Sequence, residues 1–128
     1  MFKVVTSMKK RAGLSREDFM DYYANRHIPF LQTIVKGPAP LAYRRNFVRY
    51  GDPLMDIIGH GRAVRAEADG EFDVLTEGVY RNREEAMASM GQLFVPGVLE
   101  KLLQDEQNFL QIDKVKVYVV DTHGYGDV

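Results

Sequence analysis

Apolar and polar residues alternate over four stretches of the chain, which is the period-two pattern of β-strands. These stretches are residues 2–10, 41–50, 72–80 and 115–121. Apolar residues recur at spacings of three and four over residues 14–35 and 82–94, which predicts two helices, and a shorter helical piece follows from residue 98. The order strand, helix, strand, strand, helix, strand is that of a ferredoxin-like split βαβ domain. We therefore expect an α+β fold in which a four-stranded antiparallel sheet carries its helices on one face.

The predicted strands also carry apolar residues opposite their main apolar set. These residues are Val5, Val48, Tyr50, Leu75, Val79, Tyr118 and Val120. A sheet covered by helices on one side needs only one apolar face, so the second face indicates a second cover. The same sheet of another copy, packed about 10 Å away under two-fold symmetry, is the simplest cover. We expect a homodimer in which residues 1–121 form one domain and residues 122–128 a C-terminal tail, with the paired sheets forming an α/β barrel.

The helix predicted over residues 14–35 carries the most informative pattern. Ser15 can accept free backbone N–H groups at its start, and Asp18 stands where a capping box places Glu. Steps of four from Phe19 give its inward positions: Tyr23, His27, Leu31 and Val35. Pro29 removes a backbone donor two residues after His27, so we expect the helix to be kinked or locally opened beside the histidine.

His27 on an apolar face allows two interpretations. Histidine is the side chain that titrates near neutral pH, so an inward His27 beside an irregular turn is a candidate general acid or base. A histidine in such a position is also often a hydrogen-bonded core residue. Spacing alone leaves both interpretations open.

The remaining segments are less informative. Asn82 and Glu85 form a second cap signal, and the following helix is predicted to turn five residues inward: Ala86, Met87, Met90, Leu93 and Phe94. Residues 51–70 contain no clean period, and they include His60. A connection of this length is typically mobile or functional.

Composition excludes several classes of function. A net charge of −1 without a basic run argues against nucleic-acid binding, and strand alternation separates Arg44 from Arg45 and Arg49. The chain has no cysteine, and its three histidines are not at metal-ligand spacing, so no metal or cofactor is expected. No signal peptide or membrane-length apolar run is present, which predicts a cytoplasmic protein that does not associate with membranes.

Two segments together resemble a known family. The run SREDFMDYYANRHIPFLQTI resembles the signature of the EthD-type dimeric α/β-barrel proteins, in which an aromatic pair precedes a histidine closely followed by proline. The segment DEQNFLQID, residues 105–113, resembles the acidic-aromatic segment that precedes the last strand in that family. The aromatic pair here is Tyr-Tyr, whereas tryptophan is common in the family.

The resemblance implies a cofactor-free apolar pocket between sheet and helices with the helix histidine near it. Transferred residue by residue, it implicates His27, the pair Tyr22 and Tyr23, and Asp105. Some family members accompany a cytochrome P450 system in the degradation of a fuel ether, fungal relatives dehydrate or cyclise polyketide intermediates, and a structurally similar group isomerises muconolactones.

Such a pocket supports proton transfer at a carbon next to a carbonyl: isomerisation, dehydration or cyclisation of an apolar or aromatic small molecule. His27 would carry the proton, and Tyr43, Tyr23 or Arg45 would hold the developing oxyanion. Asp105 could orient the imidazole, although an aspartate at such a place more often caps a helix end. Two alternatives remain open: a non-catalytic binding or accessory protein for an apolar ligand, and a cofactor-independent oxygenase.

Overall fold

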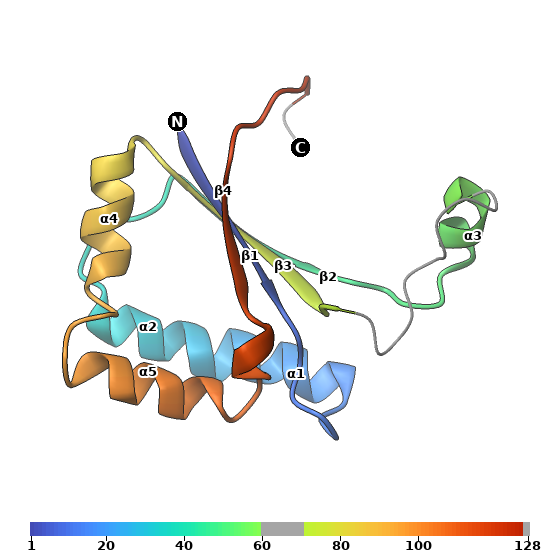
Figure 1. The fold of residues 1–128 in the computed structure, drawn as a ribbon, viewed down its shortest axis with the longest axis horizontal. Coiled ribbons are helices and arrows are strands. Elements are labelled where there is room, and N and C mark those ends of the chain that lie inside the picture. The colour runs from blue at the N-terminus through green and yellow to red at the C-terminus, as the bar shows by residue number, and fades with distance from the viewer. Residues whose placement is uncertain (60–70, 127–128) are drawn as a thin grey trace.

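Four antiparallel strands form one sheet in the order β2–β3–β1–β4 in the computed structural model, which describes residues 1–59 and 71–126 (Figure 1). The strands are β1 (Phe2–Met8), β2 (Ala42–Phe47), β3 (Val74–Tyr80) and β4 (Lys116–Val120). Every neighbouring pair is antiparallel, which confirms the predicted α+β fold and its four-stranded sheet. His60 lies outside the described residues.

The long N-terminal helix and the C-terminal helices lie on the same side of the sheet (Figure 1). The first long helix is continuous through three segments: α1 (Arg16–Tyr22), the π-helix η1 (Tyr23–His27) and α2 (Ile28–Ile34). The C-terminal half contributes α4 (Arg83–Gly91), α5 (Val98–Glu106) and the short 3₁₀-helix η2 (Ile112–Lys114). Both predicted caps are present, because Ser15 accepts from the Asp18 amide and Asn82 accepts from the Glu85 amide.

The strand register decides which residues face the helices. Arg45 lies opposite Thr76 and Arg44 lies opposite Glu77, so the two arginines lie on opposite faces of the sheet, as alternation predicts. Thr76 in turn lies opposite Thr6 on β1, and Thr6 lies opposite Val117 on β4. The helix-side face therefore carries the candidate Arg45, whereas Arg44 lies on the face that no described helix covers.

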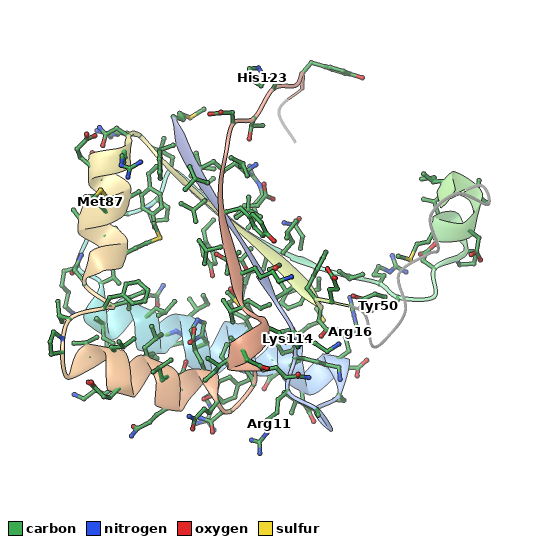
Figure 2. The ribbon with its side chains drawn as sticks, viewed as in Figure 1. Arg11, Arg16, Tyr50, Met87, Lys114 and His123 are labelled. Atoms are coloured by element: carbon green, nitrogen blue, oxygen red, sulfur yellow. The ribbon has the colours of Figure 1, made fainter. Side chains whose placement is uncertain are left out.

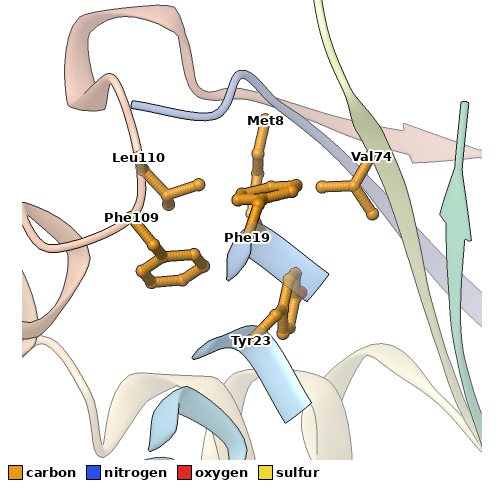
Figure 3. Packing of buried hydrophobic residues seen from close by; sticks show 6 residues of the cluster. All are labelled: Met8, Phe19, Tyr23, Val74, Phe109 and Leu110. Carbon is orange, nitrogen blue, oxygen red and sulfur yellow. The ribbon is translucent and has the colours of Figure 1, made fainter. Parts of the chain in front are cut away.

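An aromatic cluster fills the space between this face and the long helix (Figure 3). Its buried members are Met8, Phe19, Tyr23, Val74, Phe109 and Leu110. Phe109 reaches the cluster from the segment that follows α5, and its ring lies 5.8 Å from that of Phe19 and 5.5 Å from that of Tyr23. Ring contacts of this kind add to the stabilisation from burial, so the cluster fixes the long helix and the end of α5 against each other.

The start of α5 depends on a glycine. Gly97 has a φ of 88°, a left-handed conformation that residues with a Cβ rarely adopt. Its amide donates to the Glu100 carboxylate at 2.6 Å, which closes the first turn of the helix. The turn thereby sets the direction of α5 and the place of the acidic residues at its end.

The connection after β2 contains a helix that was not predicted, α3 (Pro53–Gly59). The Asp52 carboxylate accepts from the Leu54 amide, and proline suits a first helical turn. The predicted inward positions of Met87 and Phe94 are wrong. Met87, labelled on α4 in Figure 2, is 61% exposed, and Phe94 is 59% exposed. In α4 the buried positions are the small residues Ala86 and Ser89, which let the helix approach closely.

Candidate functional site

His27 ends the π-helical segment of the long helix. The Ile28 amide donates to the carbonyl of Tyr23, five residues back, in place of the usual four. Pro29 has no amide hydrogen, so the carbonyl of Asn25 cannot have its normal helical partner, and a widened turn accommodates this loss. The expected local opening beside the histidine is therefore present. The wider turn leaves both Tyr23 and His27 buried, with 0% and 3% of their surface exposed.

The His27 imidazole contacts a carboxylate from α5. Nδ1 of His27 lies 2.5 Å from Oδ2 of Asp105, although the two residues are 78 positions apart in the sequence. An ionised carboxylate can only accept, so Nδ1 donates and carries the proton of the neutral ring. That tautomer leaves the lone pair on Nε2, which is the arrangement a general base requires.

Tyr22 holds the other oxygen of the same carboxylate. Its hydroxyl donates to Oδ1 of Asp105 at 2.8 Å and accepts from the side-chain amide of Asn108 at 2.9 Å. Burial raises the pKa of Tyr22, and its bond to Asp105 raises it further, so the hydroxyl remains a donor at neutral pH. Tyr22 thus fixes the orientation of Asp105, which in turn fixes the imidazole.

Burial determines the charge of His27. Desolvation lowers the pKa of His27 below its ordinary value, and this effect exceeds the opposing influence of Asp105. The Arg45 cation lowers it further. The ring is therefore neutral at pH 7 and able to accept a proton.

Three hydroxyl groups form a chain beside the histidine. The Tyr23 hydroxyl lies 2.8 Å from that of Tyr43 on β2 and 2.8 Å from that of Thr76 on β3. Burial raises the pKa of Tyr23, and burial together with the neighbouring Tyr23 raises that of Tyr43. Both phenols stay protonated, so they can donate hydrogen bonds to an oxyanion.

Arg45 lies against this chain. Its guanidinium carbon is 5.3 Å from the centre of the Tyr23 ring, within cation–π range. Its Nη1 atom is the one fully buried side-chain nitrogen or oxygen in residues 1–59 and 71–126 that has no hydrogen-bond partner. Nε2 of His27 has no hydrogen-bond partner among the described residues either.

Sequence reasoning missed Glu106. Burial raises the pKa of Glu106 to about 7, and the neighbouring Asp105 charge adds to the increase. Its charge in turn raises the pKa of Tyr23, which places it within electrostatic reach of the site. Glu106 follows the buried Leu102 by four residues and precedes the buried Phe109 by three, so its helical phase alone indicates an inward position.

The structure brings the predicted residues together on two sides of the histidine. Asp105 and Tyr22 lie on the α5 side, and Tyr23, Tyr43 and Arg45 lie on the sheet side. Their roles in binding or catalysis remain predictions.

Two hollows lie near this network, and neither has His27 in its lining. One, of about 360 Å³, lies over Phe19 and Phe47 and is bordered by Arg16 and Tyr50, which Figure 2 labels. The other, of about 480 Å³, is lined by Tyr22 and Asn108 and lies outside the Asp105 network. Tyr22 is thus the one predicted site residue that borders either hollow.

Metal ligands do not converge in the part of the chain that the structure describes, where no group of three or more histidine, cysteine, aspartate or glutamate residues could hold an ion. Among the same residues, no helix has the length and apolar character that crossing a membrane requires.

The family model of the EthD domain matches residues 11–113. The chain belongs to the EthD family. The matched range contains the histidine of the long helix and all five of its predicted partners, and it confirms the resemblance drawn from the two sequence segments. A search of curated proteins finds no match.

Solved structures share the fold of this EthD-family chain at low sequence identity. An EthD-family protein from Bacillus halodurans C-125 has 15% identity and a TM-score of 0.57, with 96% of this chain and 100% of that chain covered. HapK from Hahella chejuensis has 10% identity and a TM-score of 0.56, with 100% and 98% covered. An EthD-like protein from Ralstonia eutropha JMP134 has 18% identity and a TM-score of 0.54, with 93% and 87% covered.

Proposed function

We propose that this EthD-family protein catalyses proton transfer at a carbon next to a carbonyl group in an apolar or aromatic small molecule, without a cofactor. The reaction class is isomerisation, dehydration or cyclisation. The observation that carries the proposal is the 2.5 Å contact between His27 and Asp105, because it leaves the lone pair of a neutral imidazole on Nε2.

In the proposed first step, Nε2 of His27 takes the proton from the carbon. The C–H electron pair moves into the new C=C bond, and the carbonyl π pair moves to oxygen. Asp105 stabilises the imidazolium that forms, and Tyr22 keeps the carboxylate in place. The proton then returns from His27 to carbon or to a leaving oxygen, so no external oxidant or reductant is required.

The developing negative charge on the substrate oxygen needs donors. The phenols of Tyr43 and Tyr23 and the guanidinium of Arg45 supply them from the sheet side. Fixed donors stabilise an oxyanion more strongly than water does, because they are already oriented towards the developing charge.

One observation favours a second candidate function. Neither measured hollow reaches His27, and the ring of Phe109 lies 4.8 Å from the imidazole. A histidine enclosed in this way also suits a protein that holds an apolar ligand without converting it. In that case Asp105 and His27 serve the fold and not a reaction.

The test requires no knowledge of the natural substrate. We expect the protein to accelerate hydrogen–deuterium exchange at the α-carbon of some aryl ketones or lactones in D₂O, measured by NMR. His27→Gln should keep the fold and reduce exchange by roughly 10²–10⁴-fold, the usual contribution of a positioned proton carrier.

The matched control is His123→Gln, which makes the same change in the exposed C-terminal segment (Figure 2). Exchange that is equal in both variants would contradict the proposal. If His27 is only a core residue, His27→Gln should instead lower the free energy of unfolding by about 1–3 kcal/mol, because a buried polar partner is lost, and leave ligand binding intact.

A further inference from the structure

Arg45 carries an enclosed donor that nothing in the described chain satisfies. The residue lies on β2 opposite Thr76, on the helix-side face, and its Nη1 atom is buried without an acceptor. Cation–π contact with Tyr23 stabilises the charge in part, but it leaves the N–H group of Nη1 unpaired.

No carboxylate of residues 1–59 and 71–126 forms an ion pair with Arg45. Within the described ranges, the ion pairs of Lys3 with Glu77 and of Arg49 with Asp52 do not involve Arg45. Asp105 is bound by His27 and Tyr22. The polar neighbours of Arg45 on the sheet side are the hydroxyls of Tyr23, Tyr43 and Thr76, which carry no charge.

A guanidinium nitrogen that is buried without an acceptor is unfavourable, because its lost hydration is not replaced. A carboxylate satisfies it best, since its two oxygens match the planar fork of arginine. Arg45 also lies close enough to His27 to act on the imidazole electrostatically. An anion bound at Arg45 would therefore lie beside the proposed proton carrier.

We infer that the molecule bound at this site carries a permanent carboxylate, which pairs with Arg45 and directs the neighbouring carbon skeleton towards His27. The inference rests on the proposed function for the reaction, and it adds the substrate class: an aromatic or alicyclic carboxylic acid with a carbonyl group. The carboxylate pairs with the partly exposed guanidinium of Arg45, and the apolar skeleton lies against Tyr43, which is 41% exposed.

Matched pairs of acids and amides test this inference by isothermal titration calorimetry at constant ionic strength and pH 7.5. The probes are benzoate with benzamide, 2-naphthoate with 2-naphthamide, and 3-phenylpropanoate with its amide. We expect at least one acid to bind about 10- to 100-fold more tightly than its amide, the range that a charge-assisted hydrogen bond supplies. Arg45→Met should remove this preference, and Arg45→Lys should reduce it because the planar fork is lost.

Arg44→Met is the matched control, because it removes the same charge from the adjacent position of β2 on the opposite face. It should leave the preference intact. Equal affinity for acid and amide, no binding of either, or a preference that survives Arg45→Met would each overturn the inference. If Arg45→Met does not fold, the inference is tested by comparing the acid–amide preference of the native protein with that of Arg45→Lys.

The outcome is separable from that of the proposed function. Hydrogen–deuterium exchange of neutral ketones that depends on His27 would support the proposed function even if the protein bound acids and amides equally. Conversely, an Arg45-dependent preference for acids without His27-dependent exchange would leave a carboxylate-binding protein that catalyses no reaction.

Discussion

Phe109 packs against the ring of His27, with centroids 4.8 Å apart, and Asp105, four residues earlier, binds Nδ1 of the same ring. One turn of chain at the end of α5 therefore supplies both a hydrogen bond and an apolar wall to the imidazole. The wall desolvates the ring and lowers its pKa, while the carboxylate fixes its tautomer. A neutral, oriented imidazole requires both contacts together.

Asp105→Asn should reduce proton exchange by about 10²–10⁴-fold while preserving the fold, because an amide can donate to Nδ1 and favour the wrong tautomer. Asp105 raises the pKa of His27, so its loss should also move the acidic limb of the pH–rate profile to lower pH. NMR exchange rates measured between pH 5 and 8 would check both effects. An unchanged profile would show that the carboxylate does not act on the imidazole.

Tyr22→Phe removes only the hydroxyl that holds Asp105, so we expect a smaller loss of roughly 10-fold in exchange rate. Tyr118→Phe makes the same change on exposed β4 and should have no effect. Hydrogen–deuterium exchange rates measured by NMR compare the two variants. Equal rates for Tyr22→Phe and Tyr118→Phe would exclude a positioning role for Tyr22.

Glu106 should make the stability of the protein depend on pH. Its pKa in the folded state is about 7, above the ordinary 4.5, so folding favours its neutral form. The favourable contribution is complete below pH 4.5 and disappears as the pH rises through about 7. Glu106→Gln cannot ionise, so the variant should gain about 2–3 kcal/mol over the native protein at pH 8 and little at pH 4.5.

Urea unfolding of both proteins across this range measures the difference. Glu84→Gln, on an exposed position of α4, is the control and should show no pH-dependent gain. A constant difference between the native protein and Glu106→Gln from pH 4.5 to 8 would contradict the raised pKa.

Phe109 should dominate the stability of the segment that holds the site. Its ring is 0% exposed and contacts Phe19, Tyr22, Tyr23 and His27. Phe109→Ala should lower the free energy of unfolding by about 3–5 kcal/mol, the usual cost of removing a buried aromatic ring. Phe94→Ala removes an exposed ring and should cost less than about 1 kcal/mol. Thermal and urea denaturation compare the two, and similar losses would show that Phe109 is not central to the core.

Much of the fold could be predicted because it depends on periodicities that the sequence displays directly. Alternation identified the four strands, and the spacing from Phe19 to His27 identified the inward face of the long helix. The exposed Met87 was misplaced because hydrophobicity alone does not reveal that α4 approaches the sheet through Ala86 and Ser89. Helix α3 was missed although Leu54, Ile57 and Ile58 recur at spacings of three and four, because this pattern covers little more than one turn between Gly51 and Gly59.

The candidate site was predictable in part. The helical phase and the family resemblance identified His27 and its partners, but neither gives the contact between Nδ1 and Asp105 across 78 positions. The missing acceptor of Arg45 and the raised pKa of Glu106 depend on enclosure by distant elements. Local sequence indicates the inward phase of Glu106, but it does not show which distant elements enclose either residue.

Homodimerisation is the last prediction, and it concerns the face of the sheet that no described helix covers. Leu75 and Val79 of β3 lie on this face with Val5 of β1, and all three are partly exposed. Burying such a face against a second copy would remove about 1,200–2,000 Å² of surface, enough for a stable pair. Light scattering should therefore give about twice the monomer mass at micromolar concentration.

Leu75→Glu places a charge at the centre of this predicted interface and should shift the protein to monomers, because an unpaired charge cannot be buried cheaply. Met87→Glu adds the same charge to the exposed side of α4 and should leave the mass unchanged. The fold of both variants is checked by their far-ultraviolet circular dichroism. A native protein that scatters as a monomer, or a dimer that tolerates Leu75→Glu as well as Met87→Glu, would rule out pairing through the open face of the sheet.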